Sequence, residues 1–383
     1  MNLHYANSIP FINELETELK NSWLEINLTD LKNNVNHIKK KLSENTKFLA
    51  VIKADAYGHG CIEVAKKLQN DVEYFGVATI AEGKILRQSE IKNPILVLGN
   101  SFMEQIHVAV KHDIDITIGL DESIQNIDNI AKYLGKRARV HLKIDTGMGR
   151  VGIRPENIKS VINLLNNAEN IDLIGVFTHY AEAENPLSNY TKKQLETFSK
   201  VVELIKLEGF GNLIIHSANS SASLLYPESH FDMARVGLAI YGYSNPIYPE
   251  LIPIMTLKSR LVSIKKVPKD TYLGYNRAFK TSFDSIIGIV PIGYADGLPR
   301  SLSNKQDVLI KGKKCPILGN ISMDQCLVDL TNIDDVCVGD EVILLGKSEN
   351  NSICANEWAE KSGLITYEIL CGFGNRLPRI YVE

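Results

Sequence analysis

The sequence has little of what marks membrane-bound, secreted or nucleic-acid-binding proteins. Its net charge of -3 lacks the basic excess that nucleic-acid binders usually carry. No apolar run approaches the ~20 residues of a membrane-spanning helix, and none of the six cysteines forms a CxxC pair. Residues 1–22 have no basic start and no long apolar core, so they do not read as a secretory signal. We therefore expect a cytoplasmic protein with reduced, mostly buried thiols and no nucleic-acid or membrane partner.

A length of 383 residues predicts two domains, and the first two thirds of the chain alternate between strand-like and helix-like segments. Near-continuous apolar runs are typical of parallel strands that are buried on both faces. They lie at 47–52, 74–78, 94–98, 114–118, 138–144, 171–177, 212–216 and 231–236, with helical patterns such as 61–69, 121–134, 157–168 and 190–208 between them. About eight such units over some two hundred residues predict an α/β fold, a (β/α)8 TIM barrel. A doubly wound open sheet is the main alternative, because periodicity cannot show that a sheet closes.

The pattern changes after about residue 245. Prolines and short β-type runs follow, and only 355–362 has a helical pattern, so the C-terminal part is predicted to be mostly β. We expect an N-terminal extension at 1–22, a barrel at 23–248 and a C-terminal β-domain at 249–383.

Lys53 directly follows the first apolar run of the barrel, in the segment AVIKADAYGHG (50–60). The carboxyl ends of barrel strands point into the active-site mouth. Burial there lowers the pKa of a lysine and favours the neutral amine that imine chemistry needs. A lysine that only extends from a strand end into solvent is the alternative reading of this position.

The whole string is similar to the attachment signature for pyridoxal phosphate (PLP) of the alanine racemase family. The resemblance recurs at several strand ends and runs from Trp23 to the C-terminus. It implies fold type III, in which Lys53 holds PLP as an imine in the barrel. It also implies a homodimer whose active sites are shared between subunits.

Other strand ends carry further family motifs. HLKIDTGMGR (141–150) matches the segment in which the arginine at position 150 contacts the cofactor phenolic oxygen and the substrate carboxylate. The family lysine at the position of Lys143 is often carbamylated. By the same resemblance, His179 lies over the cofactor ring and bonds both the catalytic tyrosine and Arg235. Each segment by itself could be a glycine turn or a structural histidine.

The resemblance also implies how the rest of the cofactor is held. Asn219 lies beside the ring in HSANS (216–220), and Arg235 faces the pyridine nitrogen. Because arginine cannot accept the proton of that nitrogen, the ring remains a weak electron sink, which suits removal and return of a proton. The phosphate is assigned to Tyr57, Ser220, Tyr367 and the backbone of Gly237 and Leu238.

Racemisation needs a base on each face of the α-carbon. Lys53 is one, and the string YLGYNRAF (272–279) aligns with the family segment that carries the second, a tyrosine of the partner subunit. We assign that role to Tyr275 rather than Tyr272, although Asn276 stands where glycine is common. Met323 is expected to bind the substrate carboxylate through its backbone N–H, and Tyr294 to line a narrow access corridor together with Tyr367.

The function that these motifs imply is alanine racemase: a PLP-dependent isomerase that interconverts L- and D-alanine without a metal and supplies D-alanine for peptidoglycan. A fold type III decarboxylase of basic amino acids is a second hypothesis, which Arg235 and Tyr275 argue against. A non-catalytic PLP carrier is a third, but such carriers are single barrels. A serine or broad-specificity racemase is a variant of the first that the sequence leaves open.

Overall fold

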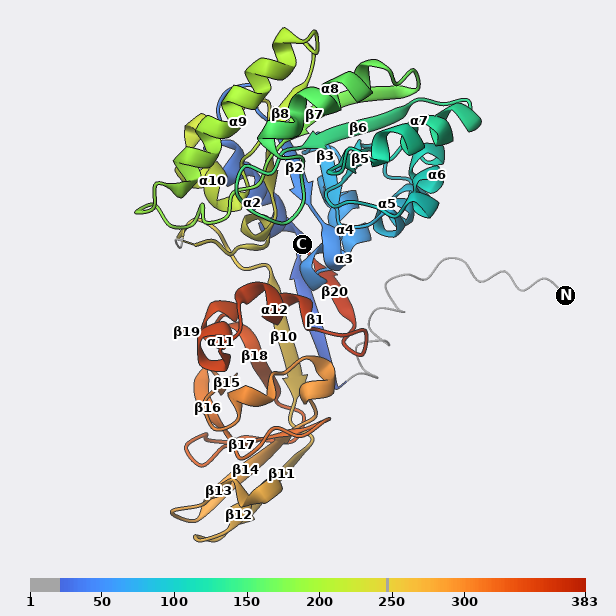
Figure 1. The fold of residues 1–383 in the computed structure, drawn as a ribbon. Helices are drawn as coiled ribbons and strands as arrows, with labels where there is room; N and C mark the ends of the chain where they lie inside the picture. Colours follow the sequence, from blue (N-terminus) through green and yellow to red (C-terminus); the bar gives the residue numbers. More distant parts are fainter. Residues whose placement is uncertain (1–20, 246–247) are drawn as a thin grey trace, which may run out of the picture. The chain divides into compact units, whose positions relative to one another are not determined.

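A computed structural model describes residues 21–245 and 248–383. The chain divides into two compact units, and each is described by itself (Figure 1). The barrel unit runs from Thr29 to Ile252, and the β unit combines the segment that ends at Leu28 with Pro253–Glu383. Residues 1–20 of the predicted N-terminal extension lie outside the described residues, and the domain ranges read from the sequence stay a prediction.

Eight parallel strands form the centre of the barrel unit. They are β2 (Lys47–Val51), β3 (Tyr74–Val77), β4 (Ile95–Val97), β5 (Ile116–Ile118), β6 (Ala138–Lys143), β7 (Ile171–Phe177), β8 (Ile214–His216) and β9 (Met233–Val236). Ladders join them into two four-stranded sheets, of order β4-β3-β2-β9 and β5-β6-β7-β8. All the pairs are parallel. The continuous apolar runs thus mark strands that are buried on both faces, as expected for a parallel sheet.

Backbone hydrogen bonds join the two sheets at both of their junctions. Between β4 and β5, Leu96 bridges to Asp115. Between β8 and β9, the Asp232 N–H donates to the Ile215 carbonyl at 2.9 Å, and the Arg235 N–H donates to the Ala218 carbonyl at 2.9 Å. The eight strands therefore follow one another in chain order around a ring, the connectivity of a (β/α)8 barrel rather than of a doubly wound open sheet.

One helix, α2, precedes β2, and others follow most of these strands. They are α2 (Leu28–Lys39), α3 (Lys53–Gly58), α4 (Cys61–Leu68), α5 (Ile80–Gln88), α6 (Met103–Lys111), α7 (Ser123–Tyr133), α8 (Ile158–Asn166), α9 (Tyr190–Leu207) and α10 (Ser220–Leu225). Figure 1 shows α5, α6 and α7 in succession along one side of the strands. Their buried residues recur at helical spacing, as Ile80, Gly83 and Leu86 do in α5, so each helix turns one apolar face inward. The four helices expected at 61–69, 121–134, 157–168 and 190–208 are confirmed to within two residues at each end.

The β unit is built on antiparallel strands. These are β10 (Met255–Arg260), β11 (Ser263–Val267), β12 (Tyr272–Leu273), β13 (Phe279–Lys280), β14 (Ser285–Val290), β15 (Asp307–Ile310), β16 (Lys313–Leu318), β17 (Cys326–Asp329), β18 (Glu341–Ser348), β19 (Asn351–Ile353) and β20 (Arg379–Val382). The N-terminal strand β1 (Ser22–Asn27) pairs with β10 and, in parallel, with β20. The mostly β character is confirmed, but the unit has two helices, α11 (Ala355–Ser362) and α12 (Thr366–Cys371), where the sequence predicted one.

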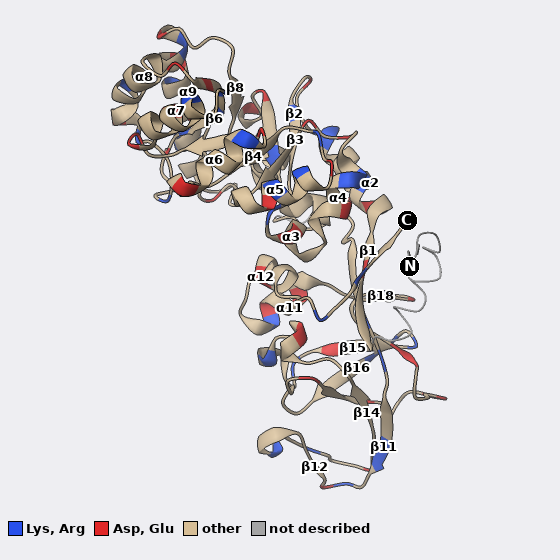
Figure 2. Cartoon of the chain, turned by 90° about the vertical axis from the view of Figure 1, so that its right-hand side faces the viewer, with Lys and Arg blue, Asp and Glu red and all other residues tan. Residues whose placement is uncertain are grey.

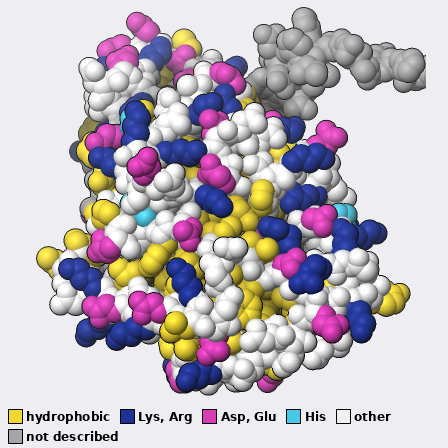
Figure 3. Space-filling model, turned by 90° about the horizontal axis from the view of Figure 1, so that it is seen from above, with side chains coloured by type: hydrophobic (Ala, Val, Ile, Leu, Met, Phe, Trp, Pro, Cys, Tyr) yellow, Lys and Arg dark blue, Asp and Glu magenta, His cyan; other side chains and the backbone are white. Residues whose placement is uncertain are grey.

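Charged side chains of both signs are interspersed over the surface. The face in Figure 3 shows basic and acidic groups alternating around a central apolar area, and Figure 2 shows both signs along the helices of the barrel unit. This mixture agrees with the small net charge of -3. No helix in the described ranges, 21–245 and 248–383, combines the length and apolar character that a bilayer crossing requires.

The cysteines are more exposed than expected. Cys315 and Cys326 are buried, whereas Cys337 and Cys371 are exposed. Cys61 and Cys354 are only partly buried. The prediction of mostly buried thiols is therefore wrong, because only two of the six are fully buried and two lie on surface segments of the β unit.

Candidate active site

Lys53 lies half-buried at the carboxyl end of β2, at the start of α3. The four residues that follow it, Ala54 to Tyr57, all have φ between 51° and 54°, so this short element is a left-handed turn. Left-handed backbone costs roughly 1–2 kcal/mol for each residue with a β-carbon. Strain of this kind persists where surrounding contacts enforce it, and it is concentrated at functional sites.

Glu82 of α5 is one of the residues that hold this turn. One of its carboxylate oxygens accepts the Ala54 N–H at 2.8 Å. The other accepts the N–H groups of Ala78 at 2.7 Å and Thr79 at 3.1 Å, at the start of α5. Asp55 adds a second link by accepting the Cys61 N–H at 2.8 Å. Sequence reasoning did not identify Glu82 as a functional residue, although the Thr79–Glu82 capping box was a readable signal for the start of a helix.

Tyr57, Ser220 and Gly237 lie together at the ends of β2, β8 and β9. The Ser220 hydroxyl accepts the Gly237 N–H at 3.0 Å. A β-carbon on Gly237 would lie only 2.6 Å from the Tyr57 hydroxyl oxygen, so glycine is required for this close approach. Asn219 caps α10 by accepting the Ala222 N–H at 2.9 Å. The structure therefore brings together Tyr57, Ser220 and Gly237 of the residues predicted to surround the phosphate, with Leu238 directly after Gly237.

Cations gather around Lys143 at the end of β6. Burial lowers the pKa of Lys143 to about 8, and the positive charges of Arg235, Arg150 and Lys53 act in the same direction. The Lys143 ammonium donates a hydrogen bond of 3.4 Å to the Leu98 carbonyl and lies 5.3 Å from the centre of the Phe177 ring. A cluster of four cationic side chains at the carboxyl ends of the strands is suited to an anionic ligand.

Arg235 on β9 is buried and oriented by several acceptors. Its Nη2 donates to the carbonyls of Thr178 at 2.7 Å and Ser217 at 3.0 Å. The same nitrogen lies 3.3 Å from Nδ1 of His179. Burial lowers the pKa of His179 to about 3, and the charge of Arg235 contributes, so the imidazole is neutral. With Nδ1 accepting from Arg235, the His179 proton lies on Nε2, which can donate to a further group.

Tyr275 lies in the β unit, in the connection between β12 and β13, and its side chain is 67% exposed. Asn276 has φ 59°, in the left-handed region. Asparagine tolerates this region better than other residues with a β-carbon, which explains how it replaces the glycine common at this position. Tyr272 is held differently: the guanidinium of Arg277 and the ammonium of Lys280 lie 5.4 Å and 5.5 Å from its ring centre.

Tyr294 and Met323 are brought together by their backbones. The Tyr294 N–H donates to the Ser322 carbonyl at 3.1 Å, and the Ala295 N–H donates to the Met323 carbonyl at 3.0 Å. Both side chains are exposed, as is that of Tyr367 on α12. The predicted site residues of the β unit are thus surface groups on loops and short helices.

Comparison with known proteins identifies the family of the chain. The family models "Alanine racemase, N-terminal domain" and "Alanine racemase, C-terminal domain" match residues 26–245 and 254–381. An alanine racemase of Halothermothrix orenii is 39% identical over 367 residues, which is 94% of this chain and 96% of that protein. This chain belongs to the alanine racemase family. Its resemblance to the family, and with it the prediction of a PLP-dependent isomerase, is confirmed.

Solved alanine racemases share the fold of this family member. The structure of an alanine racemase from Clostridium difficile 630 has a TM-score of 0.88 and 42% identity, covering 94% of this chain and 96% of that one. An alanine racemase from Bartonella henselae with covalently bound pyridoxal phosphate has a TM-score of 0.86 and 27% identity, covering 94% of this chain and 99% of that one.

The residues of this alanine racemase family member fit PLP on the geometry described above. The cofactor needs an amine for covalent attachment, hydroxyl donors for its phosphate and cationic donors for its other oxygen. Lys53 offers the amine, Tyr57 and Ser220 offer hydroxyls beside Gly237, where glycine permits their close approach, and Arg150 belongs to the cationic cluster.

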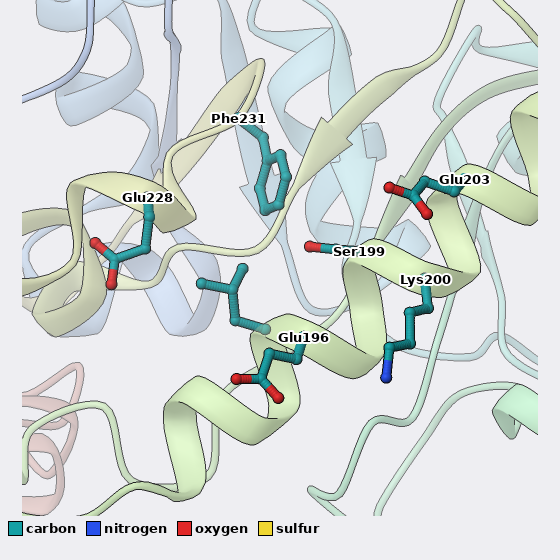
Figure 4. A pocket seen from close by; sticks show the side chains of 7 residues that line it. Glu196, Ser199, Lys200, Glu203, Glu228 and Phe231 are labelled. Carbon is teal, nitrogen blue, oxygen red and sulfur yellow. The ribbon is translucent and has the colours of Figure 1, made fainter.

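Another pocket of the barrel unit, of about 490 Å³, lies away from these groups. Figure 4 shows its lining from α9 and from the segment before β9, including Glu196, Glu203, Glu228 and Phe231. It lies towards the amino end of β9 and contains none of the predicted site residues. Its carboxylates are unsuited to a phosphate, so the cationic cluster remains the candidate active site.

Proposed function

We propose that this chain interconverts L- and D-alanine, using PLP bound covalently to the amine of Lys53. The observation that carries this proposal is the half-buried Lys53 on a left-handed turn, close enough to Lys143, Arg150 and Arg235 for their charges to act together. Bound PLP supplies one property, a more acidic α-proton on an amino acid joined to it. The side chains of the protein do the rest.

Tyr57, Ser220 and the backbone of Gly237 and Leu238 bind the phosphate in this proposal, together with Tyr367, and Asn219 lies beside the ring. Arg150 donates to the phenolic oxygen of the cofactor and to the substrate carboxylate. Met323 adds a backbone N–H to that carboxylate.

Arg235 limits the chemistry to proton removal and return. Its guanidinium has only donors and stays charged, so it does not accept a proton from the pyridine nitrogen that it faces. Without a carboxylate in this position the ring withdraws fewer electrons, which disfavours decarboxylation and transamination. The same argument speaks against a decarboxylase of basic amino acids.

Two bases act from opposite faces of the substrate α-carbon. We assign one to the Nζ atom of Lys53 and the other to the hydroxyl oxygen of Tyr275 from the partner subunit of a homodimer. The exposure of Tyr275 supports this arrangement, because a catalytic tyrosine whose side chain lies on the surface of its own chain can enter the active site of another chain. A free tyrosine has a pKa near 10, and the neutral His179 supplies an Nε2 donor that can stabilise its anion.

Lys143 is suited to carbamylation. A pKa of about 8 leaves a fraction of the amine neutral near pH 7. That amine can form an N–C bond with carbon dioxide, while one C=O pair moves to oxygen and a nitrogen proton leaves to solvent. The product is an anion that would orient Arg150. Binding of ¹³C-labelled carbon dioxide, followed by carbon NMR in the protein and in Lys143→Arg, tests this step.

The decisive experiment combines a chiral assay with absorbance. Protein loaded with PLP should racemise both alanine enantiomers without added metal, and show the visible absorbance of lysine-bound cofactor. Lys53→Ala should lose both, whereas Lys84→Ala, at an exposed lysine of α5, should keep both. Survival of the absorbance in Lys53→Ala would refute the cofactor assignment, and a preference for serine would refute the assignment of alanine as the substrate.

The physiological role that we propose is to produce, in the cytoplasm, the D-alanine that is used to build peptidoglycan.

A further inference from the structure

We propose that Asp115, His141 and His216 form a proton-ordered chain that positions Arg235. These three residues do not contact substrate or cofactor in the proposed function, on which this inference rests. They act through Arg235, by fixing which nitrogen of His216 accepts its hydrogen bond.

The chain crosses the interior of the barrel. Nη1 of Arg235 lies 3.3 Å from Nδ1 of His216. Nε2 of His216 lies 3.0 Å from Nδ1 of His141. Nε2 of His141 lies 3.4 Å from Oδ2 of Asp115, which is an ion-pair distance, and among the described residues this nitrogen makes no hydrogen bond. All four side chains are at most 4% exposed.

Arg235 fixes the position of the protons along the chain. Arginine can only donate, so Nδ1 of the neutral His216 accepts from it and the His216 proton is on Nε2. That Nε2 donates to Nδ1 of His141, so Nδ1 of His141 accepts and its proton is on Nε2, the nitrogen that faces the Asp115 carboxylate. The reverse order would place two donors against each other at Arg235.

The charges at both ends support this order. Burial raises the pKa of Asp115, but the nearby His141 and Arg139 outweigh burial and hold the pKa of its carboxyl below the usual value. Arg139 makes two of these contacts, from Nε at 2.7 Å and from Nη2 at 3.2 Å. Burial and the charge of Arg235 hold the pKa of His216 well below its usual value, so its ring is neutral.

Packing holds the two imidazole rings in place. The ring of Phe177 stacks on that of His216, with centres 4.8 Å apart and an angle of 8°. Gly175 on β7 leaves the space for His141, because a β-carbon there would lie 2.5 Å from the His141 Nδ1 atom. A hydrogen-bonded chain with fixed rings and one allowed proton order keeps Arg235 in a single orientation, as outer partners do for metal-binding histidines.

Nitrogen NMR of the histidine side chains tests the proton order in the unaltered, PLP-loaded protein. We expect His141 and His216 both to be neutral with the proton on Nε2. Variants in which one histidine at a time is replaced assign the signals. A proton on Nδ1 of either ring, or a charged ring, overturns the proposal. This readout needs no turnover, so it is independent of whether the protein racemises alanine.

Asp115→Asn provides the second test, because its amide can donate to His141 and so reverse the order. We expect the His216 proton to move to Nδ1, the absorbance of bound PLP to shift, and kcat to fall about tenfold or more, as is typical when the outer partner of a histidine is lost. Asp128→Asn is the matched control, since Asp128 is also a buried aspartate of the barrel but binds the Asn170 backbone. A folded Asp115→Asn protein with the tautomers, absorbance and kcat of the parent overturns the proposal.

Discussion

Glu82 and Ala54 are joined by a hydrogen bond of 2.8 Å from the Ala54 N–H to the Glu82 carboxylate. The bond connects the cap of α5 to the left-handed turn that follows Lys53. The Glu82 side chain, which caps the start of α5, thus also holds the strained backbone beside the candidate catalytic lysine.

Glu82→Gln is expected to loosen this turn. The amide keeps one acceptor oxygen but places an NH2 group where a second acceptor is needed, so either Ala54 or the start of α5 loses its partner. We expect a loss of about 0.5–2 kcal/mol in the free energy of unfolding, the range for a lost cap, and faster release of PLP from Lys53. Thermal unfolding and the decay of the visible absorbance measure the two effects.

Thr79→Ala separates the two roles of Glu82. Thr79 caps the same helix by accepting the Glu82 N–H at 3.2 Å, but it does not contact Ala54. It should therefore lower stability with little change in PLP release. Equal rates of release in both variants would mean that Glu82 acts only as a helix cap.

Tyr275→Phe should retain PLP and lose racemisation. Because each base serves one face of the α-carbon, deuterium exchange should fall much more for one alanine enantiomer than for the other. Tyr272→Phe is the matched control, since it keeps the ring beneath Arg277 and Lys280 and removes only a hydroxyl. Equal, mild losses from both enantiomers in Tyr275→Phe would contradict the assignment of two bases.

Gly175→Ala should displace His141. The new methyl group would lie 2.5 Å from the His141 Nδ1 atom and 2.6 Å from the Ile214 carbonyl oxygen, so the ring or the strand must move. Overpacking of this kind costs about 1–3 kcal/mol, seen as a lower melting temperature together with a shift in the absorbance of bound PLP. Gly211→Ala, which meets nothing within 4 Å, should change neither. An unchanged absorbance in Gly175→Ala would show that His141 does not act on Arg235.

His179 should make the protein sensitive to acid. Its pKa is about 3 in the fold, mainly through burial, whereas an unperturbed histidine titrates near 6.5. Between these values the unfolded chain binds a proton that the folded chain does not, so stability falls as the pH drops from about 6.5 towards 3. His179→Gln should give a shallower decline in melting temperature over this range, while His107→Gln, at an exposed position, should follow the parent. Parallel declines in all three proteins would contradict this role of His179.

The strands of the barrel could be predicted because a strand that is buried on both faces has a continuous run of apolar residues. Several residues of the barrel site could be predicted for the same reason, since Lys53, Lys143 and Arg235 lie at or near the ends of such runs. The helix α12 was missed because its six residues are too few to show a helical period.

The left-handed turn could not be predicted, because no glycine stands at positions 54–57 to indicate positive φ. Its conformation depends on acceptors that come from distant segments, such as Glu82. Asn276 is the opposite case: a residue type that tolerates left-handed backbone stands where the turn requires it.

The sequence by itself therefore determined the family, the strands and the identity of the chemical groups, because these depend on local burial and on strings of adjacent residues. Only the tertiary structure decided how those groups act on each other. His141 and His216 are 75 residues apart in the chain, and their rings meet at 3.0 Å because parallel strands bring them to the same interior. The charges of Lys53 and Arg235 both act on Lys143 for the same reason. Charges interact through space, and the closed ring of strands sets the distances between these side chains.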